Sequence, residues 1–253
     1  MAGEAKTTQF AVGTATIMLG QMSDLMNLNA AAHSVGLAKN IVVTVDNTFL
    51  DLTQGVRNQL VYQVMTGQTT RVTAEVYEYT AKNLAYGLGL DGTALAAQTA
   101  NTTLAANINA NANLAQLTNA TGFAQNDWLI LQPDASSDEI QVRKIASLAS
   151  SNATLSANVP ILVPTGSLVK KVNLINVAGP DLPAFLSMKL VGNLADGTPI
   201  AMLFPKIRVT KGFTIGFQTD NYGNLPFEIA AFAQVPSDPN YALTKAQALL
   251  AAP

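Results

Sequence analysis

Cysteine is absent from this chain of 253 residues, and histidine occurs once, at His33. Without cysteine there is no disulfide framework, no thiolate nucleophile and no zinc site built on sulfur. A single histidine excludes a metal centre with several histidine ligands, and no catalytic partner lies near His33 in the sequence. We therefore expect His33 to be a hydrogen-bonded structural residue.

Charge is also scarce, since charged residues make up 12% of the chain against about a quarter in an average globular protein. The formal net charge of −2 gives no basic footprint for gripping nucleic acid. A surface this poor in charge consists of alanine, threonine and asparagine, or other copies of the protein cover it. We favour a large contribution from the second arrangement, because weakly charged and moderately apolar surfaces are typical of subunits that assemble.

Long apolar runs are missing as well, although 49% of the residues are hydrophobic. No run reaches the roughly 18 residues that a membrane-spanning helix needs. The stretch Phe10–Leu19 is too short, is interrupted by Thr14 and Thr16, and is better interpreted as a strand than as the core of a signal peptide. We therefore expect a protein that spans no membrane and is made in the cytoplasm.

The strongest positive signal is alternation of apolar and polar residues, which is typical of strands with one buried face. Lys211–Gly212 is a two-residue break between two alternating stretches and predicts a β-hairpin. A longer polar turn leads to a third stretch, which completes an antiparallel meander. The alternating apolar positions are Ile207 and Val209, then Phe213, Ile215 and Phe217, then Phe227, Ile229 and Ala231.

Other segments extend this meander to an all-β main domain, a β-sandwich or barrel with a short helix. Strands are expected at Ile41–Val45 and Phe185–Leu194, and a second hairpin is expected to join Leu60–Met65 to Arg71–Tyr79. In its second arm, the predicted buried positions are Val72, Ala74 and Val76. A short helix is expected at Ala81–Tyr86, capped by Thr80, and an amphipathic helix at Tyr241–Ala252.

Three glycines after the first helix match the dinucleotide-binding spacing, at Gly87, Gly89 and Gly92. That site requires a strand, then the glycines, then a helix whose N-terminus holds the phosphates. Here the helix comes first, and no acidic residue follows about 20 positions later. The match therefore does not predict a nucleotide site, and we expect no cofactor.

The composition changes between residues 93 and 176, which we interpret as a domain inserted into the main one (residues 1–92 and 177–253). Thr99–Asn119 consists almost entirely of alanine, asparagine, threonine and leucine, and we interpret it as a low-complexity lead-in to this domain. Short strands at regular spacing follow it, which favours a small β-barrel.

One segment of the main domain is a candidate interaction surface. After the strand Ile41–Val45 the alternation changes phase, which indicates a bulge or a loop, and polar residues are frequent. We therefore expect Asp46–Asn58 to be a long loop that exposes Phe49, Leu50 and Leu52. An exposed apolar cluster of this kind marks a binding surface.

Besides a protein that assembles through such a surface, two classes of function are open at this stage. A two-domain adhesin or carbohydrate-binding module would use Trp128 and the tyrosines as sugar platforms, although Trp128 lies among aliphatic residues typical of a core. A hydrolase would need a carboxylate pair, such as Asp134 with Asp138 or Asp220 with Glu228. Nothing places a nucleophile, a base and an oxyanion site together, so we do not expect an enzyme. The loop from Asp134 to Glu139 also lacks a recognised calcium-binding spacing, so no metal is expected.

Several stretches resemble one known family. Val72–Gly92 reads Val-Thr-Ala-Glu-Val-Tyr-Glu-Tyr-Thr-Ala-Lys-Asn-Leu-Ala-Tyr-Gly-Leu-Gly-Leu-Asp-Gly and resembles the strand-then-helix segment of tail tube (major tail) proteins of tailed bacteriophages. Gly197–Phe232, with Leu-Phe-Pro-Lys-Ile-Arg-Val-Thr-Lys-Gly-Phe at its centre, resembles the closing strands of that family. The middle section is similar to small β modules inserted in phage tail proteins, through Gly122–Leu131, Val142–Ile145 and Leu168–Val172.

The resemblance implies a virion structural protein that forms stacked hexameric rings, a hollow tube through which the genome passes without specific binding. The implied partners are further copies of the chain, a baseplate, a terminator, and a sheath if the tail contracts. The implied location is the tail of a virion assembled in the bacterial cytoplasm. Ring closure would pair edge strands with the neighbouring subunit.

In such a tube, the Asp46–Asn58 segment would reach the next ring, with Phe49, Leu50 and Leu52 as anchors. A lumen that does not retain DNA should be neutral or acidic, and the isoelectric point of about 5.3 is compatible with that. Glu75 and Glu78, assigned to the polar side of the Arg71–Tyr79 strand, are the candidates for lining the lumen.

Overall fold

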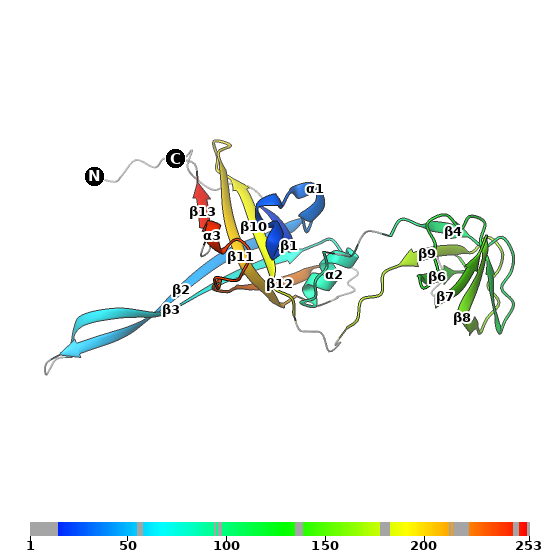
Figure 1. Ribbon diagram of the computed structural model, residues 1–253, viewed down its shortest axis with the longest axis horizontal. Helices are drawn as coiled ribbons and strands as arrows, with labels where there is room; N and C mark the ends of the chain where they lie inside the picture. The colour runs from blue at the N-terminus through cyan, green and yellow to red at the C-terminus, as the bar shows by residue number, and fades with distance from the viewer. Residues whose placement is uncertain are drawn as a thin grey trace. The chain divides into compact units, whose positions relative to one another are not determined.

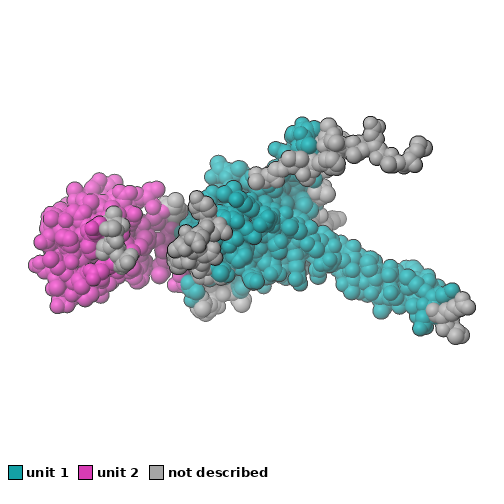
Figure 2. Space-filling model, turned by 180° about the vertical axis from the view of Figure 1, so that it is seen from behind, with its two compact units in different colours: residues 1–94, 177–253 teal, residues 95–176 magenta. Residues whose placement is uncertain are grey.

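The computed structural model describes residues 15–54, 58–93, 95, 98–134, 139–177, 183–212, 214, 223–244 and 248–251. The fold is all-β, as the alternation predicted, and is built on a seven-stranded and a six-stranded sheet. The chain divides into two compact units, Met1–Ala94 with Val177–Pro253, and Leu95–Asn176. Figure 2 colours the two units separately.

The first unit contains the seven-stranded antiparallel sheet (Figure 1). Its strands, in spatial order, are β1 (Thr16–Gln21), β10 (Leu186–Asn193), β11 (Pro199–Lys211), β12 (Leu225–Ala231), β3 (Gln59–Val76) and β2 (Ala38–Gln54). A short seventh strand, β13 (Ala248–Ala251), pairs with the first part of β11. The short helices are η2 (Met22–Asn27), α1 (Ala30–His33), α2 (Ala81–Gly87) and α3 (Tyr241–Thr244).

One hydrophobic core holds this unit together. Ile17 of β1 and Val72 of β3 belong to the same buried cluster although four strand pairings separate them, so the sheet curls around its core. The predicted alternation is confirmed where it is described, because Ile207, Val209, Phe227 and Ile229 are all buried in this cluster. The predicted inward positions of β3 are buried there too, at Val72, Ala74 and Val76.

Helix α2 begins and ends as its residues dictate. The Thr80 hydroxyl accepts a hydrogen bond from the Asn83 amide at 3.1 Å, which confirms the predicted N-cap. Gly89 follows the helix with φ +77°. Its amide and that of Leu90 donate to the carbonyls of Tyr86 and Ala85, so the helix ends in a Schellman motif.

The order of the predicted meander is wrong in one respect. β12 lies between β11 and β3, so the third predicted stretch pairs with the first and not with the second. Phe213, Ile215 and Phe217 lie outside the described residues. The predicted C-terminal helix stops at Thr244, because Ala248–Ala251 instead add a strand to β11.

The second unit is a small closed sheet, as the spacing of its strands predicted. In spatial order the strands are β4 (Asn101–Thr103), β9 (Leu168–Val172), β6 (Trp128–Gln132), β7 (Gln141–Ala149), β8 (Asn152–Val159) and β5 (Ala112–Gln116). The two ends of this order are joined, since Leu104 bridges Leu117 and the Thr118 amide donates to the Thr103 carbonyl at 2.9 Å.

The low-complexity segment Thr99–Asn119 is an integral part of the second unit. This segment supplies β4 and β5, and its apolar residues enter the core of the barrel. The buried positions are Leu104, Ile108, Ala115 and Leu117. These positions repeat at no single period, because the segment alternates between short strands and turns. For this reason the sequence pattern did not identify them as core residues.

Candidate interaction surface

Strands β2 and β3 continue past the sheet as a two-stranded ribbon (Figures 1 and 2). Every described residue from 44 to 54 and from 58 to 69 is exposed. We call these two stretches the arm. The expected loop at Asp46–Asn58 is therefore wrong over residues 46–54, which are strand, and the expected second hairpin is wrong because β3 is continuous from Gln59 to Val76.

A bulge lies beside the point at which the apolar residues of β2 change phase. Thr48 pairs with Gly67 and Phe49 with Met65, so Thr66 is the additional residue on β3. The Thr66 hydroxyl donates to the Thr48 carbonyl at 3.2 Å. A bulge increases local twist and redirects a strand, and here it lies within the arm. Of the two alternatives we had preferred a loop, and the structure has a bulge, with the extra residue on the partner strand.

Cross-strand partners share a face of a ribbon, so the register divides the exposed apolar residues into two sets. One face carries four large apolar side chains, because Leu50 pairs with Val64 and Leu52 with Tyr62. The opposite face carries Phe49 with Met65 and then Asp51 with Gln63. The three predicted anchors are all exposed, but Phe49 points to the other side of the ribbon from Leu50 and Leu52.

The second face is partly polar. The Gln63 amide donates to Asp51 Oδ1 at 2.8 Å, and the Gln68 amide donates to Asn47 Oδ1 at 3.0 Å. The arm thus has one face with two adjacent apolar pairs and one face on which an apolar pair lies between polar pairs. We call these the Leu50 face and the Phe49 face.

An isolated two-stranded ribbon is marginally stable in water, and this one buries none of its described residues. Leu50 is 66% exposed and Tyr62 is 63% exposed. Complete burial of one such side chain against a partner stabilises by about 1.5–3 kcal/mol. Tyr62 and Val64 were missed as part of this surface, because the sequence does not state which residues of β3 lie opposite Leu50 and Leu52.

The candidates for lining a lumen lie elsewhere in the unit. Glu75 pairs with Lys39 and Pro226 near the end of β3. A hydrogen bond from the Asn40 side chain is the main cause that lowers the pKa of Glu75 below its ordinary value. The Tyr77 hydroxyl also donates to the Glu75 carboxylate and lowers this pKa further. Glu78 is not on the strand face to which we assigned it, because β3 ends at Val76. Its carboxylate instead accepts the Leu37 amide at 3.0 Å.

Glu75 shares the outer face of the sheet, opposite the core, with a larger number of cations. Below the arm, along β2, β3, β12 and the second half of β11, this face carries Lys39, Arg71, Lys206, Arg208 and Lys211 with Glu75, Glu228 and Asp238. Five cations and three anions leave an excess of positive charge. A face with an excess of positive charge attracts an acidic partner. It therefore differs from the neutral or acidic wall that we expected along the path of the DNA.

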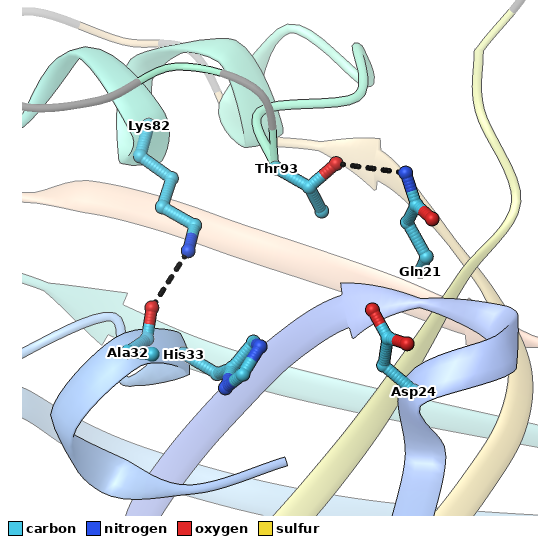
Figure 3. Close-up of a pocket in the computed structure, with 6 residues that line it drawn as sticks. All are labelled: Gln21, Asp24, Ala32, His33, Lys82 and Thr93. Carbon is cyan, nitrogen blue, oxygen red and sulfur yellow. Dashed lines mark hydrogen bonds between the residues drawn. The ribbon is translucent and has the colours of Figure 1, made fainter. Parts of the chain in front are cut away.

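A polar hollow of about 340 Å³ lies between η2, α1 and α2 (Figure 3). Lys82 donates to the Ala32 carbonyl at 2.8 Å, and burial lowers the pKa of Lys82, partly opposed by Asp91. His33 Nδ1 accepts the Asn29 amide at 3.3 Å. These contacts hold local backbone in place. Among the described residues, no group of three or more His, Asp or Glu side chains is arranged to hold a metal ion.

The glycines that match the dinucleotide spacing have structural roles. A Cβ on Gly87 would meet the Gly212 carbonyl oxygen at 2.7 Å, so α2 packs on the end of β11 through two glycines. A Cβ on Gly92 would meet the Lys82 carbonyl oxygen at 2.7 Å. Together with the cap at Gly89, these contacts account for the motif as helix packing.

Within each unit, the structure brings no described residues of the alternative functions together into a site. Asp138 and Asp220 lie outside the described residues, and Glu228 forms an exposed ion pair with Arg71 at 3.6 Å. Trp128 is half-buried in the second unit, whose sequence contains no tyrosine to complete a sugar platform. In the part of the chain that the structure describes, no helix has the length and hydrophobicity to cross a bilayer.

Comparison with known proteins adds little to this geometry. No protein-family model and no curated protein matches the sequence. Among solved structures, part of the chain is similar to the Gp54 tailspike of Acinetobacter baumannii bacteriophage AP22, which was solved in complex with an A. baumannii capsular saccharide. The match has 22% identity and a TM-score of 0.27 and covers 31% of this chain and 15% of the tailspike. A likeness of this extent carries no argument about function.

Proposed function

We propose that this protein is a structural subunit of a bacteriophage tail, and specifically a tail tube protein that assembles into stacked hexameric rings. The observation that carries the proposal is the arm, a ribbon that exposes large apolar side chains on both faces. Such a surface is typical of a segment that becomes buried against another molecule. A second copy of the chain is the partner that a tube requires.

The edges of the seven-stranded sheet support self-assembly. β2 pairs with β3 alone, so the other edge of this 17-residue strand has no strand partner among the described residues. The edge at β1 is different, since the Val35 amide donates to the Ile17 carbonyl and Ser34 bridges Met18. A long open edge is an aggregation hazard unless a specific partner covers it, and ring closure provides such a partner.

The positions of the two stretches that resemble tail tube proteins also support the proposal. Val72–Gly92 supplies the end of β3, helix α2 and its glycine cap, and Gly197–Phe232 supplies β11 and β12. Although far apart in the sequence, these stretches lie side by side, because β12 pairs with β3 and Gly87 packs on Gly212. The two stretches that resemble the family therefore form one continuous part of the unit.

The proposal is tested by electron microscopy and light scattering of the purified protein at rising concentration. Rings or hollow tubes of uniform width are expected. Replacing Phe49 and Leu52 together by Asp places a charge on each face of the arm and should leave a folded protein that no longer stacks. The matched control replaces Ile140 and Leu162 by Asp. These residues are similarly exposed in the second unit, and the control should still stack. Tubes of unchanged length in the arm variant would refute the role of the arm.

A further inference from the structure

Two phenylalanines and an arginine form a cluster on the outer face of the sheet, at the root of the arm. Arg208 pairs with Ala230, which pairs with Arg71, two residues from the end of the arm at Thr69. The Phe185 and Phe232 rings meet edge to face with centroids 5.4 Å apart. The guanidinium carbon of Arg208 lies 4.0 Å from the Phe185 centroid and 5.7 Å from the Phe232 centroid. We call these three residues the aromatic shelf.

Two cations lie at the shelf, Lys206 and Arg208, and among the described residues only Lys206 is paired with an anion. Lys206 lies 4.7 Å from the Phe185 centroid, and its ammonium bonds to Asp238 at 2.8 Å. Arg208 forms no ion pair with any described residue, and its buried Nε has no hydrogen-bond partner among them. A partly desolvated guanidinium without an anion is costly, and a carboxylate in a forked hydrogen-bonding geometry is its best partner.

The shelf fits a partner that carries apolar groups for the two phenylalanine rings and a carboxylate for the Arg208 guanidinium. Phe185 and Phe232 are 37% and 36% exposed, so part of each ring is accessible to a partner. The arm carries the matching groups on its Phe49 face, where Asp51 follows Phe49 by two residues and Met65 lies opposite Phe49. The described part of the arm contains two carboxylates, Asp46 and Asp51, and no lysine or arginine.

We propose that the aromatic shelf of one copy receives the Phe49 face of the arm of a second copy. Asp51 then bonds to the guanidinium of Arg208, and Phe49 and Met65 pack against the two phenylalanine rings. The Leu50 face fits this site less well, because Thr48 separates its carboxylate, Asp46, from the apolar group that begins at Leu50. The inference rests on the proposed function, since it requires that copies of the chain associate.

The first experiment measures self-association by light scattering for single and paired charge changes. Arg208→Glu and Asp51→Arg should each weaken association at least about tenfold, because each places like charges together. The double variant Arg208→Glu with Asp51→Arg should recover most of the loss. Arg208→Met keeps the apolar stem and should also weaken association, whereas the matched variant Arg71→Met should not. Thermal melting of each variant checks that it is folded.

The second experiment is a cross-link that reports which residues meet. Because the chain contains no cysteine, Asp51→Cys in one copy and Arg208→Cys in another introduce the only thiols. Oxidation of the mixture should give a mixed disulfide dimer in higher yield than an Arg71→Cys and Asp51→Cys mixture.

The outcomes separate the two proposals. An unmodified chain that stays monomeric at every concentration overturns both of them. If the unmodified chain assembles, and folded Arg208→Met and Arg208→Glu proteins assemble equally well, the shelf inference fails while the proposed function stands. Failure of the double variant to recover association, together with no excess of the mixed disulfide, also overturns the pairing of Asp51 with Arg208.

Discussion

Lys206 Nζ lies 2.8 Å from Asp238 Oδ2, and the two side chains are only 13% and 12% exposed. The Asp238 carboxylate also accepts the Val235 amide at 2.9 Å. This pair therefore ties β11 to the segment that follows β12. The same ammonium contacts Phe185, so the pair also supports one side of the aromatic shelf.

This pair predicts a specific loss of stability in acid. The hydrogen bond from Lys206, aided by the Val235 amide, lowers the pKa of Asp238 below its ordinary value of 3.8. A lowered pKa in the folded state means that the stabilisation is complete above the unfolded value and is lost as the pH falls through the folded value. We expect the free energy of unfolding to decrease as the pH falls below about 5, and to go on decreasing below the ordinary pKa of 3.8.

Denaturant titrations at several pH values check this expectation. Asp238→Asn should lower the melting temperature at neutral pH and should show a shallower acid dependence than the unmodified protein. Asp46→Asn, at an exposed position of the arm, is the control and should retain the full dependence. Equal acid dependence in the Asp238→Asn and unmodified proteins would show that the pair does not contribute.

Gly87→Ala should destabilise the first unit, although alanine is the better helix former. The new Cβ would lie 2.7 Å from the Gly212 carbonyl oxygen, which is backbone and cannot move aside freely. Overpacking of this kind costs about 1–3 kcal/mol, more than the gain in helix propensity of at most about 1 kcal/mol. The midpoint of urea unfolding should fall. In the control Gly192→Ala, the nearest atoms lie at 3.6 and 3.7 Å, and the midpoint should change little.

The two units should respond separately to core mutations, because their buried clusters share no residue. Leu131→Ala in the second unit and Ile207→Ala in the first remove fully buried side chains, and each should cost about 2–5 kcal/mol. Calorimetry should show that each variant lowers the melting temperature of one transition only. A single common transition shifted by both variants would contradict this independence.

Hydrogen exchange should report the state of the arm. In the monomer, amides of residues 44–54 and 58–69 should exchange fast relative to those of β10 and β11, because the arm buries none of its described residues. In the assembled protein the same amides should become protected. Protection of β10, a central strand, should be nearly unchanged and serves as the internal control. An arm that exchanges equally fast in monomer and assembly would exclude it from the contact.

Some of the fold follows directly from local patterns. Alternation identified the buried faces of β11, β12 and the inner half of β3, because a strand on a core exposes alternate residues to different surroundings. Thr80 predicted the start of α2, since capping depends on neighbouring residues alone. Composition excluded sulfur-based metal and thiol chemistry in the same way.

The sequence by itself determined that the chain is an all-β protein in two parts, with exposed apolar residues at Phe49, Leu50 and Leu52. Only the tertiary structure decided that these residues belong to a ribbon and that Phe49 faces away from the other two. Register fixes such relationships, and it depends on partners on another strand. For the same reason, sequence periodicity could not show that Phe185, Arg208 and Phe232 meet, since they come from three different parts of the chain.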